Sequence, residues 1–176
     1  MTTTYDYLDG EETNRRRELA YGVLREPPAP FFSHQQLVFR VASLLQDHVE
    51  PRGLGRVGLA PIDVILDAER ALVVQPDVLF VATERLSIIR DQVWGAPDLV
   101  VEVLSVGTES RDRHEKLGWY RQYGVREYWI VDLMDESVTV IDFSTAARDH
   151  QVFDRLGTIR SSVLPEFQAT VQSVFH

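Results

Sequence analysis

The sequence predicts an α/β protein in which a mixed β-sheet is flanked by helices and preceded by an N-terminal β-hairpin. Two segments, 33–50 and 109–123, have the residue spacing and end signals of helices. Several short runs are rich in β-branched and aromatic residues, and 97–105 and 127–133 are apolar enough to be central strands covered on both faces. Strands and helices in this order favour a mixed sheet with a helix on each face.

The chain fits a single domain spanning residues 1–176. Independent cores usually contain roughly 100–200 residues, and 44% of this chain is hydrophobic. Residues 1–14 are expected to form a short helix or to be mobile. Residues 17–26 (RELAYGVLRE) have the pattern of two short strands around a glycine turn, and they form the predicted hairpin.

Further strands complete the expected sheet. The runs 57–66 and 71–82 are dense in β-branched residues, which indicates consecutive strands. The segments 137–143 and 150–160 are expected to be antiparallel edge strands, and a short element closes the chain after Pro165.

Composition excludes several kinds of site. The chain has no cysteine, so a metal would be held by oxygen atoms or by the five histidines, and thiol chemistry is excluded. Oxygen ligands point to Mg²⁺ or Mn²⁺. The formal charge of −9 means that any binding to DNA must be local, because phosphate contacts need clustered Lys and Arg. The run 15–17 and the segment 111–126 could form a basic edge, with a solvated charged surface as the alternative.

Neither a membrane span nor a signal peptide is predicted. No stretch approaches the ~20 apolar residues that cross a bilayer. The N-terminus is polar and acidic, whereas a signal peptide would be basic and then apolar. We therefore expect a cytoplasmic protein that has no membrane partner.

Two carboxylates stand out because they lie in apolar strands. Alternate residues of a strand share one face, so Glu102 projects from its apolar run into a helix-covered face. Asp77 follows Pro76 and opens the apolar run VLFVA. A buried carboxylate needs a metal, a cation or a proton, and two on adjacent strands would repel each other. The sequence therefore indicates a divalent-metal site formed by Asp77 and Glu102, with the backbone carbonyl of Val103 as a third ligand; two unrelated strand-end acids are the alternative.

Lys116 is the third candidate catalytic residue. It is the single lysine of the chain, since the other basic residues are all arginine, although chance could also leave one lysine. A compact ammonium with a tunable pKa could position an attacking water or stabilise charge in a transition state. We expect its ammonium to be directed at Asp77 and Glu102.

An ordered set of motifs over residues 15–145 resembles the Uma-type (Uma2-like) family of restriction endonucleases, within the PD-(D/E)XK nuclease superfamily. The matching features are ELAYG near residue 18, His34, QPDVLF at 75–80, PDLVVEVLS at 97–105, Asp112, Lys116, Tyr120 and GVREYWIVD at 124–132. The resemblance implies a restriction-endonuclease-like core, an Mg²⁺ (or Mn²⁺) cofactor and endonuclease activity on DNA. It makes Asp77 and Glu102 the first and second acids of the superfamily motif, and it makes Asp112 and Tyr120 accessory candidates.

The chain departs from the plain superfamily pattern at the lysine. A lysine usually follows the second acid by two residues, but this chain has Leu104 there. In the Uma-type family the lysine lies on the following helix, at the position that Lys116 occupies. Glu18 matches an acid of the family's first strand and is a candidate extra ligand or phosphate contact. His34 matches the family's histidine, with a hydrogen-bonded structural histidine as the alternative.

Two other functions stay open beside a metal-dependent endonuclease. The same fold could serve as a non-catalytic DNA-binding or protein-binding module in which the acids pair with arginines, and the acidic net charge favours this alternative. Paired carboxylates also occur in glycosidases, but the chain lacks a long loop-rich cleft and a lysine accompanies the acids. For the endonuclease we expect a homodimer, by analogy with enzymes that cut both DNA strands.

Overall fold

The computed structural model describes residues 1–10, 13, 15–104, 109–144 and 149–176, without the side chains of 109–113 and 149. Its helices are α1 (Thr4–Leu8), α2 (Phe32–Val49), the 3₁₀ helix η1 (Thr83–Ile88), α3 (Glu109–Tyr123) and α4 (Val171–Phe175). Its strands are β1 (Glu18–Ala20), β2 (Val23–Arg25), β3 (Gly55–Leu59), β4 (Val64–Asp67), β5 (Leu72–Val74), β6 (Val78–Ala82), β7 (Val93–Trp94), β8 (Leu99–Leu104), β9 (Glu127–Asp132), β10 (Ser137–Asp142), β11 (Asp149–Phe153), β12 (Thr158–Arg160) and β13 (Gln168–Thr170). None of the described helices is long and apolar enough to span a lipid bilayer.

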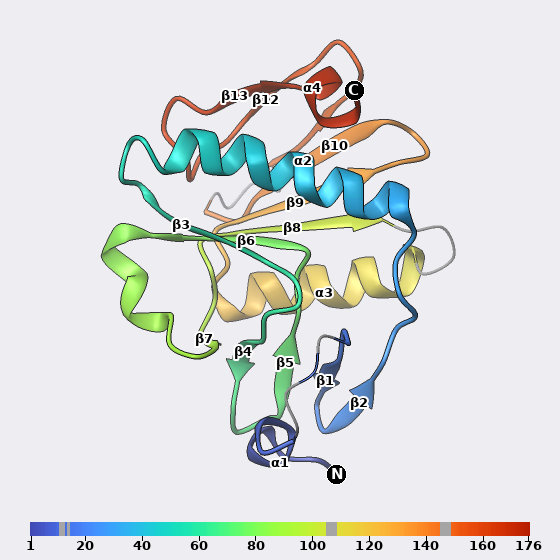
Figure 1. The fold of residues 1–176 in the computed structure, drawn as a ribbon, viewed down its shortest axis with the longest axis vertical. Coiled ribbons are helices and arrows are strands. Elements are labelled where there is room, and N and C mark those ends of the chain that lie inside the picture. Colours follow the sequence, from blue (N-terminus) through green and yellow to red (C-terminus); the bar gives the residue numbers. More distant parts are fainter. Residues whose placement is uncertain (11–12, 14, 105–108, 145–148) are drawn as a thin grey trace.

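Two β-sheets and two long helices set the architecture. The larger sheet has six strands in the order β11-β10-β9-β8-β6-β3, and α2 and α3 lie on its opposite faces (Figure 1). The second sheet, in the order β2-β1-β5-β4-β7, lies on the α3 side, and β12 pairs with β13 near the C-terminus. The predicted fold class, a mixed sheet flanked by helices with an N-terminal hairpin, is confirmed. The strands β4 and β5, however, join the hairpin in a sheet of their own.

The chain passes from one sheet to the other at Pro76 and Asp77. Before this point β5 pairs with the hairpin strand β1, and after it β6 pairs with β8. Proline cannot donate the hydrogen bond that a strand ladder requires, so one pairing ends here before the next begins. Asp77 therefore lies where the two sheets meet.

The central strand β8 has a different core on each face. Val101 packs in the cluster that contains Leu45 of α2, whereas Val100 packs in the cluster that contains Tyr120 of α3. Burial of each large apolar side chain contributes about 1.5–3 kcal/mol relative to exposure, which holds the strand in place although it carries a carboxylate. The alternation predicted for this strand places Glu102 on the α3 side, where Tyr120 contacts it.

The residues before β1 pack against the second sheet. Helix α1 begins after the N-cap Thr3, whose side chain forms a capping box with Asp6. The buried hydroxyl of Tyr7 lies 2.8 Å from Oδ1 of Asp63 and 2.9 Å from the carbonyl oxygen of Arg17, and it can donate to either. The N-terminal segment thus contains the short helix that the sequence allows, and it leads the chain from Arg17 into β1.

Replacing either of two glycines by alanine tests the fold, because the two replacements are expected to change the free energy of unfolding in opposite directions. A Cβ at Gly55 in β3 would clash with the carbonyl oxygen of Val81 in the paired strand β6, whereas a Cβ at Gly118 in α3 would meet nothing within 4 Å. We expect Gly55→Ala to lower the free energy of unfolding by more than about 1 kcal/mol. We expect Gly118→Ala to raise it by about 0.5–1 kcal/mol, since alanine favours helix. Urea denaturation measures both, and an unaffected Gly55→Ala protein would contradict the β3–β6 pairing.

Candidate active site

Polar side chains from several distant segments meet in one buried site at the junction of the two sheets. They are Arg16, Glu18, His34, Asp77, Glu102, Lys116 and Tyr120. All but Arg16 are residues that the sequence predicts for the site. Asp112, the remaining accessory candidate, lies on α3, but its side chain is outside the described residues.

Asp77 is held through both of its carboxylate oxygens. Its Oδ2 accepts the backbone N–H of Val103 at 2.8 Å and lies 3.4 Å from Nε2 of His34. Its Oδ1 accepts a hydrogen bond from Arg16 at 2.7 Å. Burial alone would raise the pKa of Asp77, but the contacts with His34 and Arg16 outweigh burial and hold the pKa below its usual range. Asp77 therefore carries a negative charge although its side chain is only 3% exposed.

For Glu102, burial outweighs the favourable contacts and its pKa is raised. Its Oε1 accepts hydrogen bonds from Nζ of Lys116 at 2.9 Å and from the hydroxyl of Tyr120 at 2.7 Å, and its Oε2 lies 3.2 Å from Nη2 of Arg16. Burial raises the pKa of Glu102 above its usual range, against the lowering effect of Lys116, and the nearby negative charge of Asp77 adds to the rise. The two acids contact one guanidinium, so they lie close together, as a shared metal site would require.

Lys116 is enclosed by carboxylates. Its Nζ lies 2.8 Å from Oε1 of Glu18 and 2.9 Å from Oε1 of Glu102. The sequence predicts Asp77 as the second partner, and this is wrong because the hairpin brings Glu18 to α3. The same Oε1 of Glu18 also accepts the N–H of Gln75 at 3.0 Å. Burial lowers the pKa of Lys116, but Glu102 and Glu18 raise it well above its usual value, so the group is an ammonium.

Arg16 also belongs to the site, although it lies in a run of three arginines that does not distinguish it from its neighbours. Its Nη1 donates to Asp77 at 2.7 Å, and its Nη2 donates to the carbonyl of Gln75 at 2.6 Å and to Glu102 at 3.2 Å. The sequence leaves open a basic edge or a solvated surface for the run 15–17, and the solvated surface does not hold for Arg16, whose side chain is 21% exposed and pairs with the acids. The spacing to Glu18 could have indicated this role. Alternate residues of an extended chain lie on the same face, so Arg16 shares a face with Glu18.

His34 orients two groups on the α2 side of the site. Its Nε2 lies 3.0 Å from the carbonyl oxygen of Val103 and 3.4 Å from Oδ2 of Asp77, and because both are acceptors, Nε2 is the protonated nitrogen. Nδ1 is buried and has no hydrogen-bond partner among the described residues. The carbonyl of Val103 keeps a second lone pair, so the contact with His34 leaves it able to bind a cation.

The donor atoms fit a hard divalent cation that is held by few protein ligands. The part of the chain that the structure describes contains no group of three or more His, Asp or Glu side chains placed to hold a metal. Two carboxylate oxygens, Asp77 Oδ1 and Glu102 Oε2, do meet at one guanidinium, and the carbonyl of Val103 would add a third oxygen ligand. Mg²⁺ typically binds one or two carboxylates and keeps several waters. The residues therefore fit Mg²⁺ or Mn²⁺ better than a closed zinc site.

A comparison with family models identifies the family of the chain. The family model Uma2, described as "Putative restriction endonuclease", matches residues 3–172. The chain belongs to the Uma2 family. The Uma-type resemblance that the motifs indicate is thus confirmed over nearly the whole sequence.

A solved structure supports the fold of this Uma2 chain. The protein is described as "a putative nuclease belonging to DUF820 from Anabaena variabilis ATCC 29413", and it superposes with a TM-score of 0.83 at 19% sequence identity. The match covers 99% of this chain and 98% of that chain. At this identity the likeness shows a shared fold. A comparison with curated proteins found no match.

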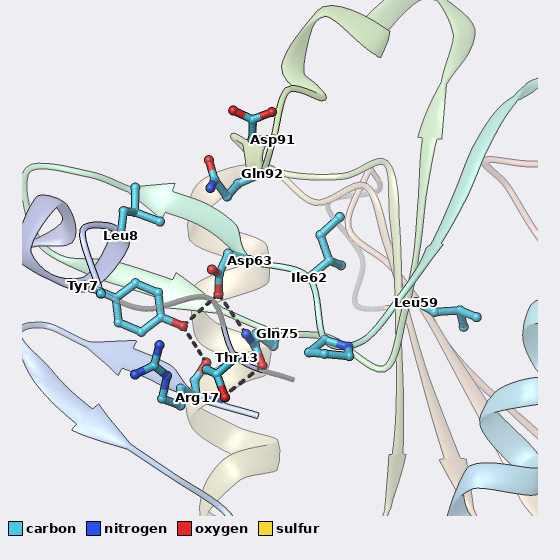
Figure 2. A pocket seen from close by; sticks show the side chains of 12 residues that line it. Tyr7, Leu8, Thr13, Arg17, Leu59, Ile62, Asp63, Gln75, Asp91 and Gln92 are labelled. Atoms are coloured by element: carbon cyan, nitrogen blue, oxygen red, sulfur yellow. Dashed lines mark hydrogen bonds between the residues drawn. The ribbon is translucent and has the colours of Figure 1, made fainter. Parts of the chain in front are cut away.

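A cavity of about 650 Å³ lies next to the candidate active site, and Gln75 lines this cavity. Figure 2 shows the Gln75 amide between Asp63 and Arg17: it donates to Asp63 at 2.9 Å and accepts the N–H of Arg17 at 3.1 Å. The backbone of Gln75 binds Glu18 and Arg16 inside the site. Gln75, which is not among the predicted site residues, therefore joins the wall of the cavity to the acidic site.

The charge of Lys116 is expected to stabilise this Uma2 protein in the absence of metal. Lys116→Met leaves Glu18 and Glu102 buried without their shared cation, so we expect a loss of about 3–5 kcal/mol in the free energy of unfolding. Urea denaturation at neutral pH measures this loss. The loss should shrink as the pH falls, because the unpaired acids then have raised pKa values in the folded state and take up a proton there.

A surface ion pair between β2 and the same helix provides the control. Arg25 lies 2.8 Å from Glu115 of α3, and both side chains are more than a third exposed. Arg25→Met should therefore lower stability by less than about 1 kcal/mol. The double variant Lys116→Met with Glu18→Gln should regain part of the loss. A Lys116→Met protein as stable as the wild type at neutral pH would show that the ammonium does not balance these acids.

Proposed function

We propose that this Uma2-family protein is a metal-dependent endonuclease that hydrolyses phosphodiester bonds of DNA, with Mg²⁺ or Mn²⁺ as its cofactor. One observation carries the proposal. Asp77 and Glu102 each have one oxygen bound by groups of the fold, and their other oxygens converge on one cation position beside the charged Lys116. The description of the family as a restriction endonuclease supports DNA as the substrate.

Asp77, Glu102 and the carbonyl of Val103 would hold the ion. When bound, a divalent ion polarises a phosphoryl oxygen and lowers the pKa of water. The protein contributes fixed ligands, because His34 and the N–H of Val103 orient Asp77, and the hydroxyl of Tyr120 orients Glu102. Ligands that are already in place need little reorganisation when the substrate arrives.

Lys116 would act as a fixed positive charge and not as a base. Its raised pKa keeps it protonated, and a preorganised ammonium stabilises the negative charge that develops on the phosphate in the transition state. Glu18 holds the ammonium from the second side. In this proposal Glu18 is a positioning residue for Lys116 rather than a metal ligand.

One observation favours a second function, a non-catalytic module that binds DNA or protein. Arg16 pairs with both acids, as expected if the carboxylates have a structural role. The net charge of −9 also disfavours a general affinity for DNA. The two functions differ in measurable properties: the nuclease binds a divalent ion at Asp77 and Glu102 and cuts DNA, whereas the module leaves DNA intact.

A homodimer would suit the proposed nuclease, because two sites must face two backbones to cut both strands. Two sites acting together convert supercoiled plasmid directly to linear DNA, whereas a single site accumulates nicked circles. The ratio of linear to nicked product, followed as the protein concentration rises, therefore tests the dimer.

Plasmid cleavage tests the enzyme directly. Wild-type protein with MgCl₂ or MnCl₂ is expected to nick or linearise supercoiled plasmid, and EDTA should stop the reaction. Asp77→Asn and Glu102→Gln keep the size of each side chain but remove a charged ligand. Because a metal supplies several kcal/mol of transition-state stabilisation, each variant should cleave at least about 100-fold more slowly.

The matched control is Asp135→Asn, which makes the same change at an exposed acid between β9 and β10 and should cleave like wild type. Folded wild-type protein that leaves plasmid intact with both metals would contradict the proposal, as would full activity of Asp77→Asn. Intact plasmid together with a metal-independent mobility shift would instead support the DNA-binding module.

A further inference from the structure

We propose that Arg16 is a built-in counter-cation: it occupies the metal position in the metal-free protein and is exchanged for a divalent ion when the metal binds. The inference rests on the proposed metal site and adds a regulatory residue to it. Arg16 would set the concentration of metal needed to fill the site.

Arg16 contacts the two carboxylate oxygens that are left for a metal. Oδ2 of Asp77 accepts the N–H of Val103, and Oε1 of Glu102 accepts Lys116. The guanidinium binds the other two oxygens, Oδ1 of Asp77 at 2.7 Å and Oε2 of Glu102 at 3.2 Å. A divalent ion that took these two oxygens would therefore displace Arg16.

The position of Arg16 makes such a displacement feasible. Its side chain is 21% exposed, compared with 3% for Asp77 and 9% for Glu102 and Lys116, so Arg16 lies on the solvent side of the acids. It also precedes β1 and belongs to no helix or strand. Lys116, by contrast, is anchored on α3 between two acids. Of these two described cations, Arg16 is the one that can leave without opening the core.

Charge balance explains why the metal-free site needs a second cation. Among the side chains that the structure describes, three buried carboxylates, those of Glu18, Asp77 and Glu102, meet the two cations Lys116 and Arg16. A divalent ion in place of the guanidinium would balance the three acids together with Lys116. Buried charges of one sign are unfavourable unless they are paired. Arg16 therefore keeps the acids together before the metal arrives, and for the same reason it lowers the affinity for metal.

Isothermal titration calorimetry with MnCl₂, in the absence of DNA, tests the exchange without relying on cleavage. Arg16→Gln removes the competing cation, and Arg16→Lys keeps the charge but loses the planar fork that spans both acids. We expect Arg16→Gln to bind Mn²⁺ at least about tenfold more tightly than wild type, with Arg16→Lys in between. Arg15→Gln, the same change at the exposed neighbouring position, should bind like wild type.

The outcomes separate this inference from the proposed function. Metal binding that is equal or weaker in both Arg16 variants would overturn the exchange while leaving the metal site intact. The same enhancement in Arg15→Gln as in Arg16→Gln would also overturn it, by assigning the effect to net charge. If none of the folded proteins binds Mn²⁺, the metal site itself is wrong. If Arg16→Gln does not fold, Arg16→Lys decides, and a wild-type affinity in that variant counts against the exchange.

Thermal unfolding gives a second readout. Without metal, Arg16→Gln should melt at a lower temperature than wild type and Arg15→Gln, because the acids have lost a partner. Addition of Mn²⁺ should raise its midpoint more than that of wild type, since tighter binding to the native state gives a larger shift. A metal-free midpoint equal to that of wild type would show that Arg16 does not balance the acids.

Discussion

The candidate site depends on a balance of buried charge at the place where the two sheets meet. Glu18 from β1, Asp77 between β5 and β6, and Glu102 in β8 would repel one another without cations. Lys116 links Glu18 and Glu102 to α3, and Arg16 links Asp77 and Glu102 to the chain before β1. These ion pairs connect the N-terminal hairpin, the second sheet and α3 to the central strand.

The two cations differ in chemistry and in place, and this difference suits a metal-dependent site. Lys116 is a compact ammonium on a long helix, enclosed by acids and almost without exposure. Arg16 is a planar fork on an irregular segment at the solvent side. A fixed ammonium can stabilise the transition state in every turnover, whereas a guanidinium at the solvent edge can be displaced by an incoming metal ion. In the proposed exchange the acids stay in place in both states.

The site residues that could be predicted are those that are unusual within their own stretch of sequence. Glu102 and Asp77 are carboxylates in apolar runs and Lys116 is the single lysine, so each is visible in the sequence without the fold. Arg16 lies in an arginine run, and its burial results from the pairing of β1 with the distant strand β5. The same pairing brings Glu18 to Lys116. For the fold, turn and strand signals located the long helices and the principal strands, but the division into two sheets depends on which distant strands pair, and local patterns do not encode that choice.

A crystal structure of the protein with Mn²⁺ bound tests the central claim most directly, because anomalous scattering locates the ion independently of any assumed ligand. We expect one Mn²⁺ between Asp77 and Glu102, with Lys116 still between Glu18 and Glu102 and Arg16 withdrawn from both acids. An ion bound elsewhere, or Arg16 still paired with both carboxylates in crystals saturated with Mn²⁺, would contradict the charge balance described above.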